Sequence, residues 1–181
     1  MTGLDECNRI FEEISGISLR FRPKTKVPIQ SLRTAMERAE GLPTAEFEAL
    51  RESITQGLSF RLMYLGTLAA EEAVNARDAS WLRITLLVHV LENFKFDFRE
   101  NFLRLYAAEY AAWRLGVNIA DIVSTLDPLM TTHARELFAN VFNEPHGQAA
   151  LQLADLSVIE VDGEMRFAPV PDPFRRRGPA A

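Results

Sequence analysis

One glutamate and two histidines are the residues of this sequence best suited to chemistry: Glu109, His89 and His133. Glu109 lies three residues after Tyr106 and four before Trp113, which predicts that it shares the apolar face of a helix. A carboxylate there must be hydrogen-bonded, paired or protonated, because an unpaired buried charge is very costly. Glu109 is therefore the first candidate for a catalytic acid, a base or a ligand, with His89 and His133 as the other catalytic candidates.

A structural role for Glu109 accounts for the same pattern, and we favour it. A buried carboxylate can neutralise an arginine, and Arg61 and Arg83 are the candidate partners. Glu109 would also be tolerated at the edge of a helix interface.

Carboxylates and histidines occur on successive predicted helices, an arrangement with which helical bundles hold pairs of metal ions. The candidate ligands are Glu72, beside Glu71, and then His89, Glu92, Glu109, His133 and Glu136. Those bundles use Glu-x-x-His, whereas both pairs in this chain have the order His-x-x-Glu. A metal site is therefore an alternative that we do not favour, and we expect no cofactor.

A basic cluster forms the candidate contact for an anion or a partner. Its members are Arg20, Arg22, Lys24 and Lys26, and the Arg175–Arg177 run near the C-terminus could join them. Such a cluster suits nucleic acid or an acidic partner. No aromatic-interleaved groove or helix-turn-helix pattern supports specific readout, so the sequence favours a solvated loop and tail over specific recognition.

The bulk composition is that of an ordinary globular protein. The 181 residues are 48% hydrophobic and 25% charged, and the net charge of −5 argues against general binding to nucleic acid. Cys7 is the only cysteine, which excludes an intrachain disulfide and suits a reducing compartment. We find no signal-peptide pattern and no apolar run long enough to span a membrane, so we expect a cytoplasmic protein of bacterial type.

A pair of antiparallel helices over residues 79–116 is predicted to form the centre of the fold. The first helix is apolar nearly all round, apart from a narrow strip made by Thr85, His89, Glu92 and Asn93. We expect other helices to cover it, 44–76 on one side and 128–143 on the other. The second helix carries a face at helical spacing, formed by Phe98, Phe102, Leu105, Tyr106 and Trp113.

Around this pair, apolar spacing predicts further helices over about 3–15, 29–40, 44–76, 118–126, 128–143 and 147–154. Gly16 is the expected end of the first helix, and residues 17–22 alternate like a short strand. Gly57 and Gly66 lie inside the 44–76 helix, where they indicate either close packing, which we favour, or a break.

The period changes from helix to strand near the C-terminus. Residues 156–161 and 164–168 flank Asp162-Gly163 and predict a β-hairpin, with 17–22 as the candidate third strand. The expected fold is mainly α: an antiparallel multi-helix bundle or a HEAT-like helical array with a small C-terminal hairpin. We expect one domain over residues 1–170, with core helices over 28–143, and a disordered tail over 171–181.

These observations favour a non-catalytic helical protein that works through protein contacts, such as an adaptor, an immunity-type protein or a regulatory subunit. An acidic surface suits a basic protein partner. The alternative is a helical-bundle enzyme, or a ligand- or metal-binding protein, centred on Glu109 with His89 or His133. We expect no membrane association and no nucleic-acid partner.

Overall fold

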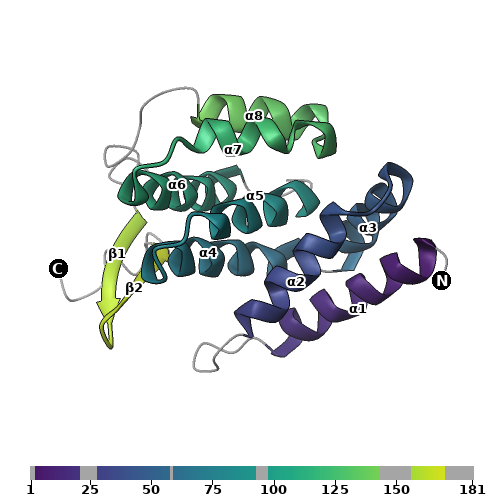
Figure 1. The fold of residues 1–181 in the computed structure, drawn as a ribbon, viewed down its shortest axis with the longest axis horizontal. Helices are drawn as coiled ribbons and strands as arrows, with labels where there is room; N and C mark the ends of the chain where they lie inside the picture. The colour runs from purple at the N-terminus through teal and green to yellow at the C-terminus, as the bar shows by residue number, and fades with distance from the viewer. Residues whose placement is uncertain (1–2, 21–27, 58, 93–97, 143–155, 170–181) are drawn as a thin grey trace.

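The computed structural model describes residues 3–20, 28–57, 59–92, 98–142 and 156–169, and within them the protein is mainly α-helical (Figure 1). The helices are α1 (Gly3–Arg20), α2 (Ile29–Glu40), α3 (Thr44–Gly57), α4 (Ser59–Asn75), α5 (Ser80–Glu92), α6 (Phe98–Leu115), α7 (Ile119–Thr125) and α8 (Thr132–Phe142). A short 3-10 helix, η1 (Asp127–Leu129), precedes α8, and the strands β1 (Leu156–Val161) and β2 (Glu164–Pro169) form a two-stranded antiparallel sheet. The predicted mainly-α fold with a C-terminal hairpin is confirmed.

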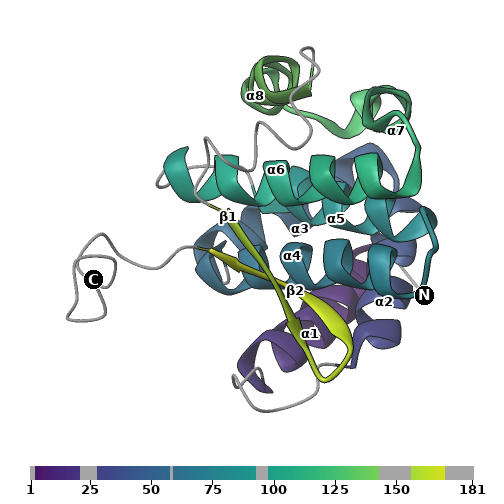
Figure 2. The same ribbon diagram turned by 90° about the vertical axis from the view of Figure 1, so that its left-hand side faces the viewer.

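Helix α5 forms the centre of the molecule, as its sequence predicts. Every residue from Trp81 to Glu92 except Arg83 is buried, as expected of a helix that is apolar nearly all round. Its most extensive contact is with α4, and α2, α3, α6 and α7 also pack against it. Residues 128–143 were expected to cover α5. Instead α8 packs chiefly on α6 (Figure 2).

Helix α1 is longer than the sequence predicts. Gly16 lies inside the helix rather than at its end, and residues 17–20 are helical rather than extended. Ile17 is buried, three residues after the buried Ile14, so the helical spacing of apolar residues continues through this segment. The predicted third strand is therefore wrong for residues 17–20, and residues 21–22 lie outside the described residues.

The single helix expected over 44–76 is divided into α3 and α4. Gly57 ends α3 beside Phe11 of α1, where a Cβ atom would lie 3.5 Å from the Phe11 ring. Gly66 stays inside α4 and marks close packing, because a Cβ there would lie 3.3 Å from His89 Nε2. Both glycines thus lie where another helix approaches, Gly57 beside α1 and Gly66 beside α5, and residue 58, between α3 and α4, lies outside the described residues.

Helix α6 buries small side chains as well as large ones. Leu105 is buried, but much of the inner surface consists of alanines: Ala107, Ala108, Ala111 and Ala112. Trp113, expected on the apolar face, is half exposed. Alanines let neighbouring backbones approach closely, so this packing leaves the indole at the rim of the interface.

The connection from α7 to α8 is more broken than expected. Asn118, the first residue of the predicted 118–126 helix, caps α7 by accepting a hydrogen bond from the Ala120 N–H at 3.1 Å. Pro128 lies in η1 rather than at the start of the last long helix. That helix, α8, begins after Thr131, whose hydroxyl accepts from the Ala134 N–H at 3.1 Å.

The hairpin forms at the predicted residues. Asp162 and Gly163 have φ angles of 52° and 80°, the left-handed pair that a two-residue turn of this kind requires. The strands pair from Leu156 opposite Pro169 to Val161 opposite Glu164. The sheet lies at one end of the molecule, against α4 (Figure 1).

Candidate functional site

The histidine of the central helix lies in the protein interior. His89 is fully buried and Glu92, one turn later on α5, is 2% exposed. His89 Nδ1 lies 3.8 Å from Glu92 Oε2. On its other side the imidazole lies against Gly66 of α4. The polar strip predicted on this helix therefore faces other helices, with Thr85 also buried and donating to the Trp81 carbonyl at 3.2 Å.

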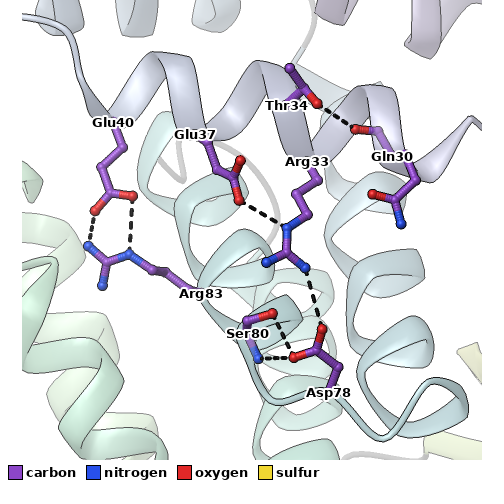
Figure 3. Close-up of polar contacts among 8 residues, drawn as sticks. All are labelled: Gln30, Arg33, Thr34, Glu37, Glu40, Asp78, Ser80 and Arg83. Carbon is purple, nitrogen blue, oxygen red and sulfur yellow. Dashed lines mark hydrogen bonds and ion pairs between the residues drawn. The ribbon is translucent and has the colours of Figure 1, made fainter.

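Glu109 is buried on α6, as its place among apolar residues predicts, with 7% of its surface exposed. Arg83, one of the two arginines expected to neutralise it, binds Glu40 of α2 (Figure 3). Arg83 also donates to the Thr125 hydroxyl of α7. The side chain of Arg61, the second candidate, lies outside the described residues.

The candidate metal ligands are divided between the interior and the surface. His89, Glu92 and Glu109 are buried, and Glu72 is half-buried on α4. His133 and Glu136 are exposed on α8. Across the described residues, no group of three histidine, cysteine or acidic side chains could hold a metal ion.

The basic cluster falls mostly outside the described part of the chain. Arg20 is the last residue of α1, and its side chain is not described. Arg22, Lys24 and Lys26 lie within 21–27, and the expected 147–154 helix and 171–181 tail are likewise outside the described residues.

A polar network joins α2 to the start of α5, and it accounts for the arginines on this face (Figure 3). Arg33 binds Glu37 at 2.9 Å and Asp78 at 3.6 Å, and its guanidinium lies over the Trp81 ring. Asp78 accepts from the Ser80 N–H at 3.0 Å and so caps α5. The Ser80 hydroxyl also donates to Asp78, at 2.7 Å. The hydrogen bonds from the Ser80 hydroxyl and N–H, with the nearby Arg33, lower the pKa of Asp78. Arg33–Glu37 is a pair within α2, whereas Arg33–Asp78 and Arg83–Glu40 join α2 to the start of α5, so we assign the network a structural role.

Arg51 is a buried residue whose role the sequence reasoning missed. It is 3% exposed, and it donates to the Val90 carbonyl at 3.2 Å and to the Leu129 carbonyl. It also binds Glu48 at 2.6 Å. Arg51 thereby joins α3 to the last turn of α5 and to η1. Its place four residues after Phe47, on an apolar stripe, is the signal that could have revealed it.

Two polar side chains of α4 hold the hairpin. Asn75 Nδ2 donates to the Met165 carbonyl at 3.1 Å, and the Met165 N–H donates to Asn75 Oδ1 at 2.9 Å. The Phe167 N–H donates to Glu71 Oε1 at 2.8 Å, and Arg166 approaches Glu71 Oε2 at 3.4 Å. Burial raises the pKa of the Glu71 carboxyl, and the contacts with Phe167 and Arg166 oppose that rise.

Three large apolar side chains are exposed among the described residues, one on α6 and two on β1. Trp113 of α6 is 50% exposed, and Ile159 and Val161 of β1 are 45% and 43% exposed. The Trp113 ring lies 5.6 Å from the Tyr110 ring, which in turn lies 5.7 Å from Phe167 of β2. We call Trp113, Ile159 and Val161 the hairpin-end surface.

The fold and these positions define a mainly helical protein with buried titratable residues and with exposed apolar side chains on α6 and β1. Comparison of the chain with protein-family models, with curated proteins and with solved structures found no match. In the described residues, no helix combines the length and the apolar character needed to cross a membrane.

Proposed function

We propose that this chain is a non-catalytic protein that acts by binding another protein through the hairpin-end surface. The observation that carries the proposal is the half-exposed Trp113, whose ring lies at a tilted angle beside Tyr110. Tryptophan is among the residues that most often anchor protein interfaces, because it brings a large apolar area at a small cost in side-chain entropy. Ile159 and Val161 of β1 are the two other large apolar side chains exposed among the described residues.

The burial of the chemical candidates supports this proposal over the alternative. A catalytic acid or base must come within hydrogen-bonding reach of its substrate. His89, Glu92 and Glu109 are 0%, 2% and 7% exposed, so helices would have to separate before a solute could touch them. An enzyme or ligand-binding site centred on Glu109 with His89 or His133 is therefore the less favoured function.

We place this binding function in the cytoplasm. Cys7, the only cysteine of the sequence, is a buried free thiol in α1. A reducing compartment suits a protein whose fold includes no disulfide among the described residues. An adaptor, an immunity-type protein or a regulatory subunit would each act through such a surface, and the net charge of −5 suits a basic partner.

Capture of the native partner with matched variants tests the proposal. The full chain serves as bait in an extract of its own host, beside Trp113→Gln and a control, Arg9→Gln, whose side chain is 53% exposed on α1. We expect the wild type and Arg9→Gln to retain the same protein, which is then purified and titrated by calorimetry. Trp113→Gln should weaken its binding by about 30-fold, the effect of an interface anchor worth about 2 kcal/mol.

Two results would contradict the proposal. The first is a purified partner that binds Trp113→Gln, or a variant with Ile159 and Val161 both changed to threonine, as tightly as it binds the wild type. The second is a catalytic activity of the wild type that Glu109→Gln abolishes while its circular dichroism spectrum stays unchanged.

A further inference from the structure

The two outer edges of the hairpin are in different situations. The outer edge of β2 is occupied, because Asn75 and Glu71 of α4 bind the backbone of Met165 and Phe167. On β1, the only strand that pairs in the described part of the chain is β2. No strand of the described residues pairs with the opposite side of β1, and we treat this side as the edge at which a further strand could join.

The register shows which backbone groups β1 presents at this edge. Met165 lies opposite Glu160, and Phe167 lies opposite Val158. In an antiparallel pair, two opposed residues either bond to each other or both point their backbone groups outward. The backbone groups of Met165 and the N–H of Phe167 face α4, away from β1. The backbone N–H and C=O groups of the opposed residues, Glu160 and Val158, must therefore face the other edge of the hairpin.

The side chains along this edge alternate in character. Ile159 and Val161 project from one face of the sheet and are 45% and 43% exposed. Glu160 projects from the other face and is exposed, and the exposed Asp162 follows in the turn. Neither Glu160 nor Asp162 forms an ion pair with another residue in the described part of the chain. An added strand would thus meet apolar side chains on one face and a carboxylate on the other.

We propose that β1 receives an extended segment of the partner protein, in which lysine or arginine alternates with apolar residues, as a third strand. This inference rests on the proposed binding function and names the partner's chemistry. Backbone hydrogen bonds to Val158 and Glu160 supply the pairing, and side chains select the sequence. The basic residues lie beside Glu160, and the apolar residues lie beside Ile159 and Val161.

The charge of the edge favours this partner over a second copy of the chain. Pairing of β1 with β1 of another copy would bring two acidic edges together, and like charges on opposed strands are destabilising. A charged residue on an edge strand is a common protection against self-association. The same Glu160 attracts a basic strand.

A peptide probe tests the proposal on the full-length protein. The probe has about eight residues, with lysine alternating with valine, which is enough to span an average strand. NMR measures the binding and the hydrogen exchange of each backbone amide. We expect the amides of Val158 and Glu160 to become protected from exchange when the probe binds, because they gain hydrogen-bond partners.

Altered peptides separate backbone pairing from attraction of charge. The same probe with N-methyl groups on the amides of one edge keeps every side chain and loses the backbone donors. It should not bind, and a probe with glutamate in place of lysine should not bind either. Binding of the N-methylated probe with unchanged affinity would overturn the proposal.

A charge-reversed variant and its matched control test the role of Glu160. Glu160→Lys should weaken binding of the probe about three- to tenfold, as expected for exchanging an attractive cross-strand charge for a repulsive one. Glu12→Lys makes the same change at an exposed position of α1 and should leave the affinity unchanged. Thermal unfolding of both variants checks that the fold is intact.

The failure of this proposal is distinguishable from the failure of the proposed function. If a captured partner depends on Trp113 but is indifferent to Glu160→Lys, and the probe does not bind, the binding function stands and the edge proposal falls. If the amides of Val158 and Glu160 are already protected in the free protein, the chain or a second copy covers the edge, and the proposal also falls.

Discussion

The side-chain amide of Asn75 hydrogen-bonds both backbone groups of Met165, at 3.1 Å to its carbonyl and at 2.9 Å from its N–H. One turn earlier, Glu71 accepts from the Phe167 N–H at 2.8 Å. Residues four apart on a helix are about 6 Å apart along its axis, and residues two apart on a strand are separated by about 6.7 Å. Because these spacings match, α4 binds β2 as a neighbouring strand would. A lone hairpin is marginal in water, and this contact supplies the support it needs.

Removal of the Glu71 and Asn75 side chains should lower the free energy of unfolding, and the two losses should depend on each other. We expect Glu71→Ala to lower the free energy of unfolding by about 1–3 kcal/mol, because it leaves the buried Phe167 N–H without its acceptor. Asn75→Ala should cost about 0.5–1.5 kcal/mol. Urea denaturation measures both variants and the double variant.

The double variant should lose less than the sum of the single losses, because either change alone already weakens the same contact. Glu164→Gln, an exposed change on β2, is the control and should cost less than about 1 kcal/mol. Strict additivity of the two α4 variants would show that Glu71 and Asn75 act independently of a shared hairpin contact.

Stability should depend on pH through Glu71. Its pKa in the folded protein is raised above the ordinary 4.5, chiefly by burial. The folded state therefore binds this proton more tightly than the unfolded state does, and the resulting stability is present at low pH and lost as the pH rises through the folded pKa. Glu71→Gln mimics the protonated carboxyl and removes the titration.

The stability of Glu71→Gln relative to the wild type should consequently increase as the pH rises from about 4.5 through the folded pKa, and then level off. Thermal or urea unfolding at a series of pH values measures this difference. A difference that stays constant over the whole series would show that the pKa of Glu71 is the same in the folded and unfolded states.

Substitution of the buried Arg51 should lower the free energy of unfolding more than most substitutions of arginines at the surface. Arg51→Met keeps the apolar stem but removes the donors to the Val90 and Leu129 carbonyls. We expect a loss of about 2–4 kcal/mol in the free energy of unfolding, since two carbonyls lose their partner and each costs about 1–3 kcal/mol when left unsatisfied in the interior. Chemical denaturation measures the loss.

Arg51→Lys discriminates between charge and geometry. Lysine keeps the charge but lacks the guanidinium fork, so it should restore only part of the lost stability. Arg135→Met, which breaks an exposed pair with Asp127, is the control and should cost less than about 1 kcal/mol. Full recovery in Arg51→Lys would mean that the two-carbonyl geometry is unimportant.

Two helical glycines should respond differently to the same substitution. At Gly16 of α1 an added Cβ meets nothing within 4 Å, so Gly16→Ala should raise the free energy of unfolding by about 0.5–1 kcal/mol through helix propensity. At Gly66 the Cβ would lie 3.3 Å from His89 Nε2 and 3.4 Å from Val88 Cγ1. Gly66→Ala should therefore gain less than Gly16→Ala, and Gly66→Val should be clearly destabilising.

Thermal unfolding of the three variants measures these effects. A destabilised Gly16→Ala would indicate that residue 16 ends the helix, as the sequence alone suggested. A Gly66→Val variant as stable as the wild type would mean that α4 and α5 are not in close contact at this point.

The burial of the candidate residues could be predicted from the sequence, but the partners and exposure of several other side chains could not. The burial of Glu109 followed from its apolar neighbours, and α5 was expected to need covering on all sides. The exposure of Trp113 and the role of Glu71 were not foreseen. Trp113 shares helical spacing with buried residues, and whether it lies at the centre or the rim depends on how closely the alanines of α6 let other helices approach.

The sequence by itself determined the elements that depend on nearby residues. The bounds of α2, the cap at Asn118 and the turn at Asp162-Gly163 each follow from interactions over a few positions. Only the tertiary structure decided that residues 17–20 are helical, that Arg83 binds Glu40, and that α4 holds the edge of β2. The physical reason is that these outcomes depend on contacts between residues far apart in the chain, whose free energy exceeds the small differences in local propensity.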